Sequence, residues 1–102
     1  MQITTTTTDG KMILALEGRV DTVTAPELER ALQLDGVKDL TLDFAKVPYM
    51  SSAGLRCLLV AHKTMLAQGG RMQLISVSPT VKEVLDMTGF SVFLNIVEDV
   101  KG

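Results

Sequence analysis

The segment DLTLDFAKVPYMSSAGLRCLLVAHKTMLAQGG, residues 39–70, carries the clearest secondary-structure pattern of the chain. Polar and apolar residues alternate over residues 39–44, which is typical of a strand with one buried side. A long helical pattern follows the turn Ser51-Ser52-Ala53-Gly54 and runs through Gln68, where Gly69-Gly70 stops it. The apolar side of the strand consists of Leu40, Leu42 and Phe44. The segment therefore predicts a strand, a tight turn and a helix in succession.

The helix after the turn has two distinct faces at the 3.6-residue spacing of an α-helix. The face expected to pack in the core consists of Leu55, Leu58, Leu59, His62, Met65 and Leu66. The face expected to remain outside consists of Ser52, Arg56, Val60 and Lys63. Because the outer face is partly apolar, we expect it to contact something other than the core.

Before this segment, the pattern predicts a hairpin and a first helix. The β-branched run Thr4 to Thr8 is followed by Asp9-Gly10, a strong two-residue hairpin signal. The second arm, residues 11–17, is mostly apolar, so we expect a strand covered on more than one side. Thr24 is expected to cap a helix that has Pro26 in its first turn.

After this segment, residues 71–77 alternate again as a strand, and Ser78-Pro79 opens a third helix that ends near Gly89. Residues 90–97 form a last apolar segment that fits a helix or a strand. The order predicts a single α/β domain over residues 1–102. Its mixed sheet has an N-terminal hairpin followed by parallel strands, with helices packed on it.

The composition narrows the classes of function. The chain has 102 residues and a formal charge of −2, which disfavours the broad attraction that non-specific nucleic-acid binding needs. No apolar stretch approaches the roughly 20 residues of a membrane-spanning helix, and the N-terminus lacks the pattern of a secretion signal. We therefore expect a cytoplasmic protein without membrane insertion, in which Cys57 is an unpaired spectator thiol.

The sequence contains few residues that could support catalysis. The one histidine, His62, falls within the core stripe, so a nucleophile–histidine pair is not expected. One Cys and one His cannot supply a zinc site, and no glycine-rich phosphate loop precedes a helix. Nothing in the spacing brings carboxylates such as Asp21 and Asp43 together. We expect no cofactor, no metal and no enzymatic activity.

The turn at Ser51-Ser52-Ala53-Gly54 remains as the candidate site. A serine at a strand-to-helix junction can cap the free N–H groups of the helix, and that structural role needs only one serine. A phosphate on such a serine would lie against the positive end of the helix and add about −1.5 to −2 of charge at the surface. The turn is thus suited to a switch that leaves the fold intact.

Three stretches resemble the STAS domain family, in particular the bacterial anti-sigma factor antagonists. They are GRVDTVTAPEL (residues 18–28), LDFAKVPYMSSAGL (residues 42–55), and the segment from Gly69-Gly70 through SPTVK (78–82) to MTG (87–89). The resemblance covers essentially the full length. The family's turn resembles Met-Asp-Ser-Ser-Gly, which aligns with Met50 to Gly54, so Ser51 stands in place of the family's aspartate.

This resemblance implies a partner-switching protein. The unphosphorylated antagonist binds an anti-sigma factor that is also a serine kinase, and phosphorylation at Ser52 releases it; Ser51 becomes a competing acceptor. A serine phosphatase is the second expected partner, and the free protein is expected to be a monomer or a weak dimer. The implied partner-binding residues are Asp21, Ser51, Ser52, Ala53, Gly54, Arg56 and Val60.

An alternative from another class stays open. A STAS accessory subunit of a lipid-transport or signalling complex would have no phosphorylation cycle, and the replaced aspartate favours it. The two hypotheses differ in the effect of Ser52→Asp, which abolishes partner binding only if the serine is a switch.

Overall fold

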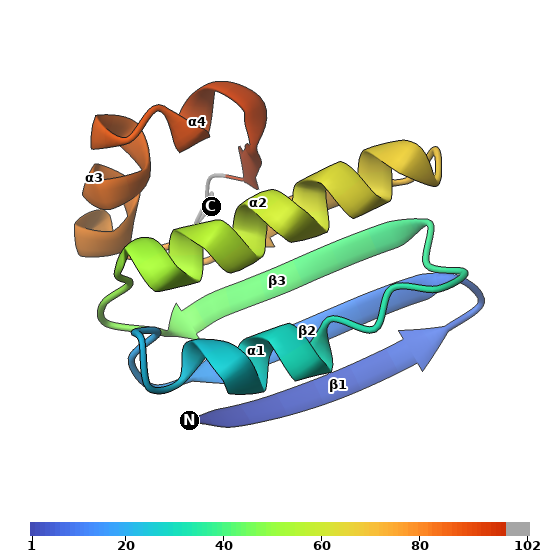
Figure 1. Cartoon of the computed structure of the whole chain (residues 1–102), viewed down its shortest axis with the longest axis horizontal. Helices are drawn as coiled ribbons and strands as arrows, with labels where there is room; N and C mark the ends of the chain where they lie inside the picture. Colours follow the sequence, from blue (N-terminus) through green and yellow to red (C-terminus); the bar gives the residue numbers. More distant parts are fainter. Residues whose placement is uncertain (98–102) are drawn as a thin grey trace, which may run out of the picture.

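A computed structural model describes residues 1–97 of the chain. It shows one α/β domain built on a five-stranded sheet in the order β1-β2-β3-β4-β5 (Figure 1). The strands are β1 (Gln2–Thr8), β2 (Lys11–Glu17), β3 (Asp39–Lys46), β4 (Arg71–Ile75) and β5 (Asn95–Val97). The helices are α1 (Ala25–Ala31), α2 (Ser52–Ala67), α3 (Pro79–Met87) and α4 (Phe90–Phe93). The mixed sheet confirms the predicted fold class.

The hairpin forms where the sequence predicts it. Asp9 and Gly10 both have positive φ, 50° and 80°, as a type I′ turn requires. Strands β1 and β2 pair antiparallel from Thr8–Lys11 to Gln2–Glu17, whereas β2 to β5 pair parallel. Residues 90–97, which the sequence left open, form the short helix α4 and then β5.

The helices cover one face of the sheet. Successive right-handed crossovers in one direction place every connecting helix on the same face, and in Figure 1 α1 and α2 lie in front of the strands. On β2, Leu14 is fully buried while its neighbour Ile13 is 45% exposed on the opposite face. The expectation that β2 is covered on more than one side was therefore wrong.

The core lies between this face and the helices. Leu40, Leu42 and Phe44 of β3 are fully buried, as predicted. On α2, Leu55, Leu58 and Met65 are buried and His62 is half-buried against Phe93, with ring centroids 5.0 Å apart. Leu66 is 63% exposed, which contradicts the predicted core stripe. The burial of Cys57 and Ala61 shows that the core face of α2 is turned toward α1 relative to that prediction.

Hydrogen bonds join the turns at the amino ends of the parallel strands. The Gly10 carbonyl accepts from the Lys38 and Asp39 amides at 2.7 and 3.2 Å, and the Lys38 carbonyl accepts from the Arg71 amide at 2.9 Å. The Gln68 side-chain amide donates to the carbonyls of Leu34 and Val37, both at 2.9 Å. These bonds connect the turns at this end of the sheet, and α1 and α2 begin at the opposite end.

None of the helices in residues 1–97 combines the length and the apolar character that a membrane crossing needs.

Candidate functional site

Two loops meet at the carboxyl end of the parallel strands. One connects β2 to α1 and the other connects β3 to α2. The Val20 amide donates to the Tyr49 carbonyl at 3.0 Å, and the Ser51 amide donates to the Val20 carbonyl at 2.8 Å. These bonds form an isolated parallel bridge between Val20 and Met50. They place Asp21, which directly follows Val20, beside the serine turn.

The two serines of the turn have different structural roles. Ser51 is the N-cap of α2: its backbone is extended, with φ −97° and ψ −179°, and its hydroxyl accepts from the Ala53 amide at 3.3 Å. It is half-buried. Ser52 is the first helical residue and its side chain is exposed. Capping therefore occupies Ser51 and leaves the Ser52 hydroxyl facing solvent.

Gly54 allows α2 to begin close to the neighbouring loop. A Cβ atom at this position would lie 2.6 Å from Cγ1 of Val20 and 2.7 Å from Cγ of Met50. Both neighbours are buried core side chains. Gly54 is thus required for close packing in the first turn of α2, and its place at the partner-binding surface remains a prediction.

Asp21 shapes the loop before α1. Its Oδ1 accepts from the amides of Val23 and Thr24 at 3.0 and 3.1 Å. The bond from the Thr24 amide is the main reason that the pKa of Asp21 is lowered from its ordinary value of 3.8, with smaller help from Arg19, whose Nε lies 3.8 Å from Oδ2. Desolvation opposes this shift in pKa. Asp21 is therefore an ionised loop-forming residue near neutral pH.

Thr24 stands at the N-cap position of α1, but its side chain does not cap that helix. The Thr24 hydroxyl accepts from the Asp21 amide at 2.9 Å and donates to the Arg19 carbonyl at 2.8 Å. The predicted role of Thr24 is therefore corrected: its hydroxyl closes the preceding loop on itself. Pro26 lies in the first turn of α1, as predicted.

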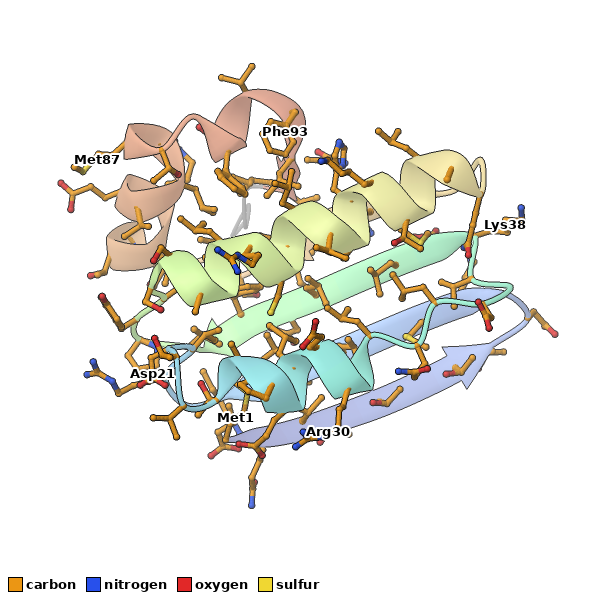
Figure 2. The ribbon with its side chains drawn as sticks, in the orientation of Figure 1. Met1, Asp21, Arg30, Lys38, Met87 and Phe93 are labelled. Atoms are coloured by element: carbon orange, nitrogen blue, oxygen red, sulfur yellow. The ribbon has the colours of Figure 1, made fainter. Side chains whose placement is uncertain are left out.

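A groove of about 500 Å³ lies between α1 and α2 and begins at the serine turn. One wall belongs to α2 and includes four predicted site residues, Ser52, Ala53, Arg56 and Val60. The opposite side is formed by the loop before α1 and by α1 itself, including Thr22, Pro26 and Glu29. Figure 2 shows Asp21 in that loop, at the end of the sheet where both helices begin.

Cys57 also lines this groove. It is buried, its thiol donates to the Ala25 carbonyl at 3.7 Å, and desolvation raises the pKa of the thiol above its ordinary value of 9.0, with a further contribution from Glu29. A thiol of this kind is mostly protonated at neutral pH and is a weak nucleophile. Within residues 1–97 no cluster of His, Cys, Asp and Glu is placed to hold a metal ion.

Sequence patterns did not identify two exposed groups near the turn. Val23 is 82% exposed, and Tyr49 is 37% exposed with the Arg19 guanidinium 4.8 Å from its ring centroid. Both residues lie in the two loops that the Val20–Met50 bridge joins. Isolated apolar residues in loops have no periodicity, so no pattern in the sequence marks Val23 or Tyr49 as exposed.

The fold and the serine turn together can be compared with known proteins. The model of the STAS domain family matches residues 2–102. The chain belongs to the STAS family. This confirms the resemblance seen in the sequence.

Among STAS relatives, BtrV of Bordetella bronchiseptica, described as a candidate anti-sigma factor antagonist, is 37% identical over 93 residues, covering 88% of this chain and 80% of that protein. The anti-sigma-B factor antagonist of Staphylococcus aureus is 28% identical over 101 residues, covering 96% of this chain and 94% of that protein.

The anti-sigma factor antagonist SpoIIAA shares the STAS fold at 19% identity. Its unphosphorylated form gives a TM-score of 0.84, covering 98% of this chain and 90% of that chain. Its phosphorylated form, from Bacillus, gives a TM-score of 0.75, covering 98% of this chain and 93% of that chain.

Proposed function

We propose that this STAS protein is an anti-sigma factor antagonist that acts in the cytoplasm by partner switching. It binds an anti-sigma serine kinase while Ser52 is unmodified, phosphorylation of Ser52 releases it, and a serine phosphatase restores it. The observation that carries the proposal is the exposed Ser52 hydroxyl at the start of α2, at the mouth of the groove between α1 and α2. The proposed role is binding without catalysis.

The charges around Ser52 suit a phosphate in the free protein. The first turn of α2, which lies wholly within the described residues, carries no acidic side chain, so its positive end is not neutralised from within the helix. A negative group at an exposed helix N-terminus typically gains about 0.3–1 kcal/mol. The phosphorylated chain should therefore stay folded.

The same phosphate should oppose docking. A partner that covers Ser52 and the outer side of α2 would have to desolvate about −1.5 to −2 of charge against apolar groups such as Val60, which is 55% exposed. Burying an uncompensated polar group already costs a few kcal/mol. This penalty exceeds the local gain at the helix end, so phosphorylation favours the released state.

The capping bond supports Ser52 over Ser51 as the acceptor. Ser51 stands where the family's aspartate would be, its hydroxyl accepts from the Ala53 amide, and its side chain is half-buried. Phosphorylating Ser51 would require breaking that bond and turning the side chain outward. Ser52 requires neither change.

The relatives support the class of function. BtrV and the Staphylococcus aureus protein carry the description of anti-sigma antagonists, and SpoIIAA has been solved with and without its phosphate. A STAS fold therefore accepts a phosphate without being lost.

The test uses wild-type protein, Ser52→Asp, Ser52→Ala and Ser51→Ala, each immobilised and exposed to native lysate. We expect wild type to retain a serine kinase that transfers phosphate from ATP to Ser52, as located by mass mapping. Ser52→Ala should bind but accept no phosphate, Ser51→Ala should do both, and Ser52→Asp should lose the kinase. A kinase-bound wild type with no phosphate on either serine would remove the proposed cycle.

The accessory-subunit alternative is favoured by one observation, that Ser51 replaces an acidic residue and is used as a cap. On this alternative, Ser52→Asp retains whatever partner the wild type binds. The same capture experiment therefore separates the two functions.

A further inference from the structure

The edge strand β1 is unusually open for pairing. It spans Gln2–Thr8, forms one edge of the sheet, and contains five consecutive threonines with no charged residue and no proline. Natural edge strands are commonly protected by short length, lysine, proline or a bulge. The opposite edge strand, β5, spans only Asn95–Val97. None of those protective features occurs in β1, whose pairing with β2 is continuous over all seven residues.

The hairpin turn determines which backbone groups of β1 face outward. In a two-residue type I′ hairpin, the residues that flank the turn form a hydrogen-bonded pair, here Thr8 and Lys11. Hydrogen-bonded pairs recur at every second residue, so Thr6, Thr4 and Gln2 also bond to β2. The remaining residues, Ile3, Thr5 and Thr7, therefore direct their N–H and C=O groups away from the sheet.

These outward groups are symmetric about the middle of the strand. Thr5 is the midpoint of Gln2–Thr8, and Ile3 and Thr7 lie two residues on either side of it. An antiparallel two-fold pairing centred on Thr5 matches Thr5 with its own copy and Ile3 with Thr7. These three hydrogen-bonded pairs exchange two bonds each, about six in total. Moving the two-fold axis to Thr6 leaves only Thr5 and Thr7 paired, so the register centred on Thr5 is favoured.

We infer that β1 is a self-association edge at which a second copy of this chain pairs antiparallel, with the two-fold axis at Thr5, joining two five-stranded sheets into one. An interface of this kind is isologous, so any charged side chain at its centre would face its own copy. The threonine run places no charge within the strand itself, and the charged side chains of α1 that line the same hollow as Thr5, namely Glu27 and Arg30, are of opposite sign. Threonine also has a high preference for strands, which favours an ordered edge.

The surroundings of β1 include a hollow between the strand and α1. Its lining comes from Met1, Ile3 and Thr5 on one side and from α1 on the other, where Glu27 and Arg30 carry opposite charges; Figure 2 labels Arg30 on this side of α1. No residue of β1 lines the groove between α1 and α2. Self-association is therefore compatible with a partner at Ser52. A single seven-residue strand gives a small interface, so the dimer forms and dissociates with concentration.

Engineered cysteines test the register directly. The Thr5 Cα atoms of the two copies should lie about 5.5 Å apart, within the range that a disulfide bridges. The two Thr7 Cα atoms should be offset by four residue steps, about 13 Å along the strands, which is beyond the reach of a disulfide. Under mild oxidation, Thr5→Cys should form a covalent dimer rapidly, whereas Thr7→Cys, on the same strand and face, and wild type, with only the buried Cys57, should not. Cross-linking of Thr7→Cys in preference to Thr5→Cys would overturn the register.

Sedimentation equilibrium tests the association itself. Wild type should shift from 11.0 kDa toward twice that mass as concentration rises. Thr5→Lys and Thr5→Glu should each remain monomeric, because like charges meet at the axis, and an equimolar mixture should recover the dimer. Circular dichroism checks that both variants fold. A wild type that stays monomeric at millimolar concentration, or a mixture that fails to associate, contradicts the inference, and neither result bears on the switch at Ser52.

Discussion

At the scale of single residues, Asp21 accepts hydrogen bonds from backbone amides of its own loop and also carries a negative charge. Because its pKa is lowered in the folded protein, its charge stabilises the fold fully above the ordinary value of 3.8, and this contribution is lost as pH falls through the lower folded pKa. Asp21→Asn keeps the oxygen that accepts from Val23 and Thr24 but removes the charge. The difference in free energy of unfolding between wild type and Asp21→Asn should be constant near neutral pH and shrink below pH 3.8, as urea unfolding at several pH values would measure.

Gly54 gives a second prediction for a single residue. Gly54→Ala gains helix propensity of at most about 1 kcal/mol, but its Cβ would overlap Val20 and Met50. Overpacking of this kind typically costs about 1–3 kcal/mol. We expect net destabilisation in urea unfolding. Ala53→Gly, the reverse exchange at the neighbouring position, measures how much helix propensity alone contributes to the free energy of unfolding. If Gly54→Ala stabilised the protein by that same amount, the contact of position 54 with Val20 and Met50 would not be tight.

At the scale of elements, the two serines at the start of α2 should contribute differently to stability, because Ser51 caps the helix and Ser52 is exposed. Ser51→Ala removes the acceptor for the Ala53 amide and should cost about 0.5–2 kcal/mol of unfolding free energy. Ser52→Ala, one residue later and exposed, should change the stability by less than about 0.5 kcal/mol. Thermal or urea unfolding of this matched pair measures both. Equal losses would mean that the cap is shared between the serines.

The elements also show how far the sequence alone leads. Helices α2 and α3 were predicted because capping serines precede them and glycines follow them. Strands β3 and β4 were predicted because polar and apolar residues alternate, and β1 and β2 because the Asp9-Gly10 hairpin signal lies between a threonine run and an apolar run. Residues 90–97 stayed open because a short apolar run has no decisive period. Their change from helix to strand near Leu94 depends on pairing with β4, a contact between distant parts of the chain.

The candidate site also has one part that the sequence predicts and one part that it does not. The serine turn is a local feature, and its residues were predicted from the sequence. The groove between α1 and α2 depends on how the two helices approach each other, which no local pattern encodes. For the same reason the predicted core face of the helix included Leu66 and left out Ala61, while Cys57 was expected only as a buried or half-exposed spectator thiol. Two rows of apolar side chains were available, and tertiary packing selected between them.

At the scale of the whole molecule, the helices cover only one face of the sheet, and two neighbouring residues of β2 report this asymmetry. Leu14→Ala, at a fully buried position, should lower the free energy of unfolding by about 2–5 kcal/mol. Ile13→Ala, on the bare face, should lower it by about 1 kcal/mol or less, the range of strand preference. Urea unfolding of the two variants measures the contrast. Similar losses at both positions would indicate that something covers the second face in solution.

The hydrogen bonds that join the turns at the amino ends of the parallel strands have a consequence for engineering. The carbonyls of Gly10, Leu34, Val37 and Lys38 are satisfied at the amino ends of the parallel strands. At the other end, the bridge between the buried residues Val20 and Met50 holds the two loops in place. A chimera that takes the other residues of 19–23 and 49–53 from another family member, but keeps Val20 and Met50, should therefore melt near the parental temperature while exchanging its binding specificity. The binding specificity of this fold could then be moved from one family member to another by exchanging two short loop segments.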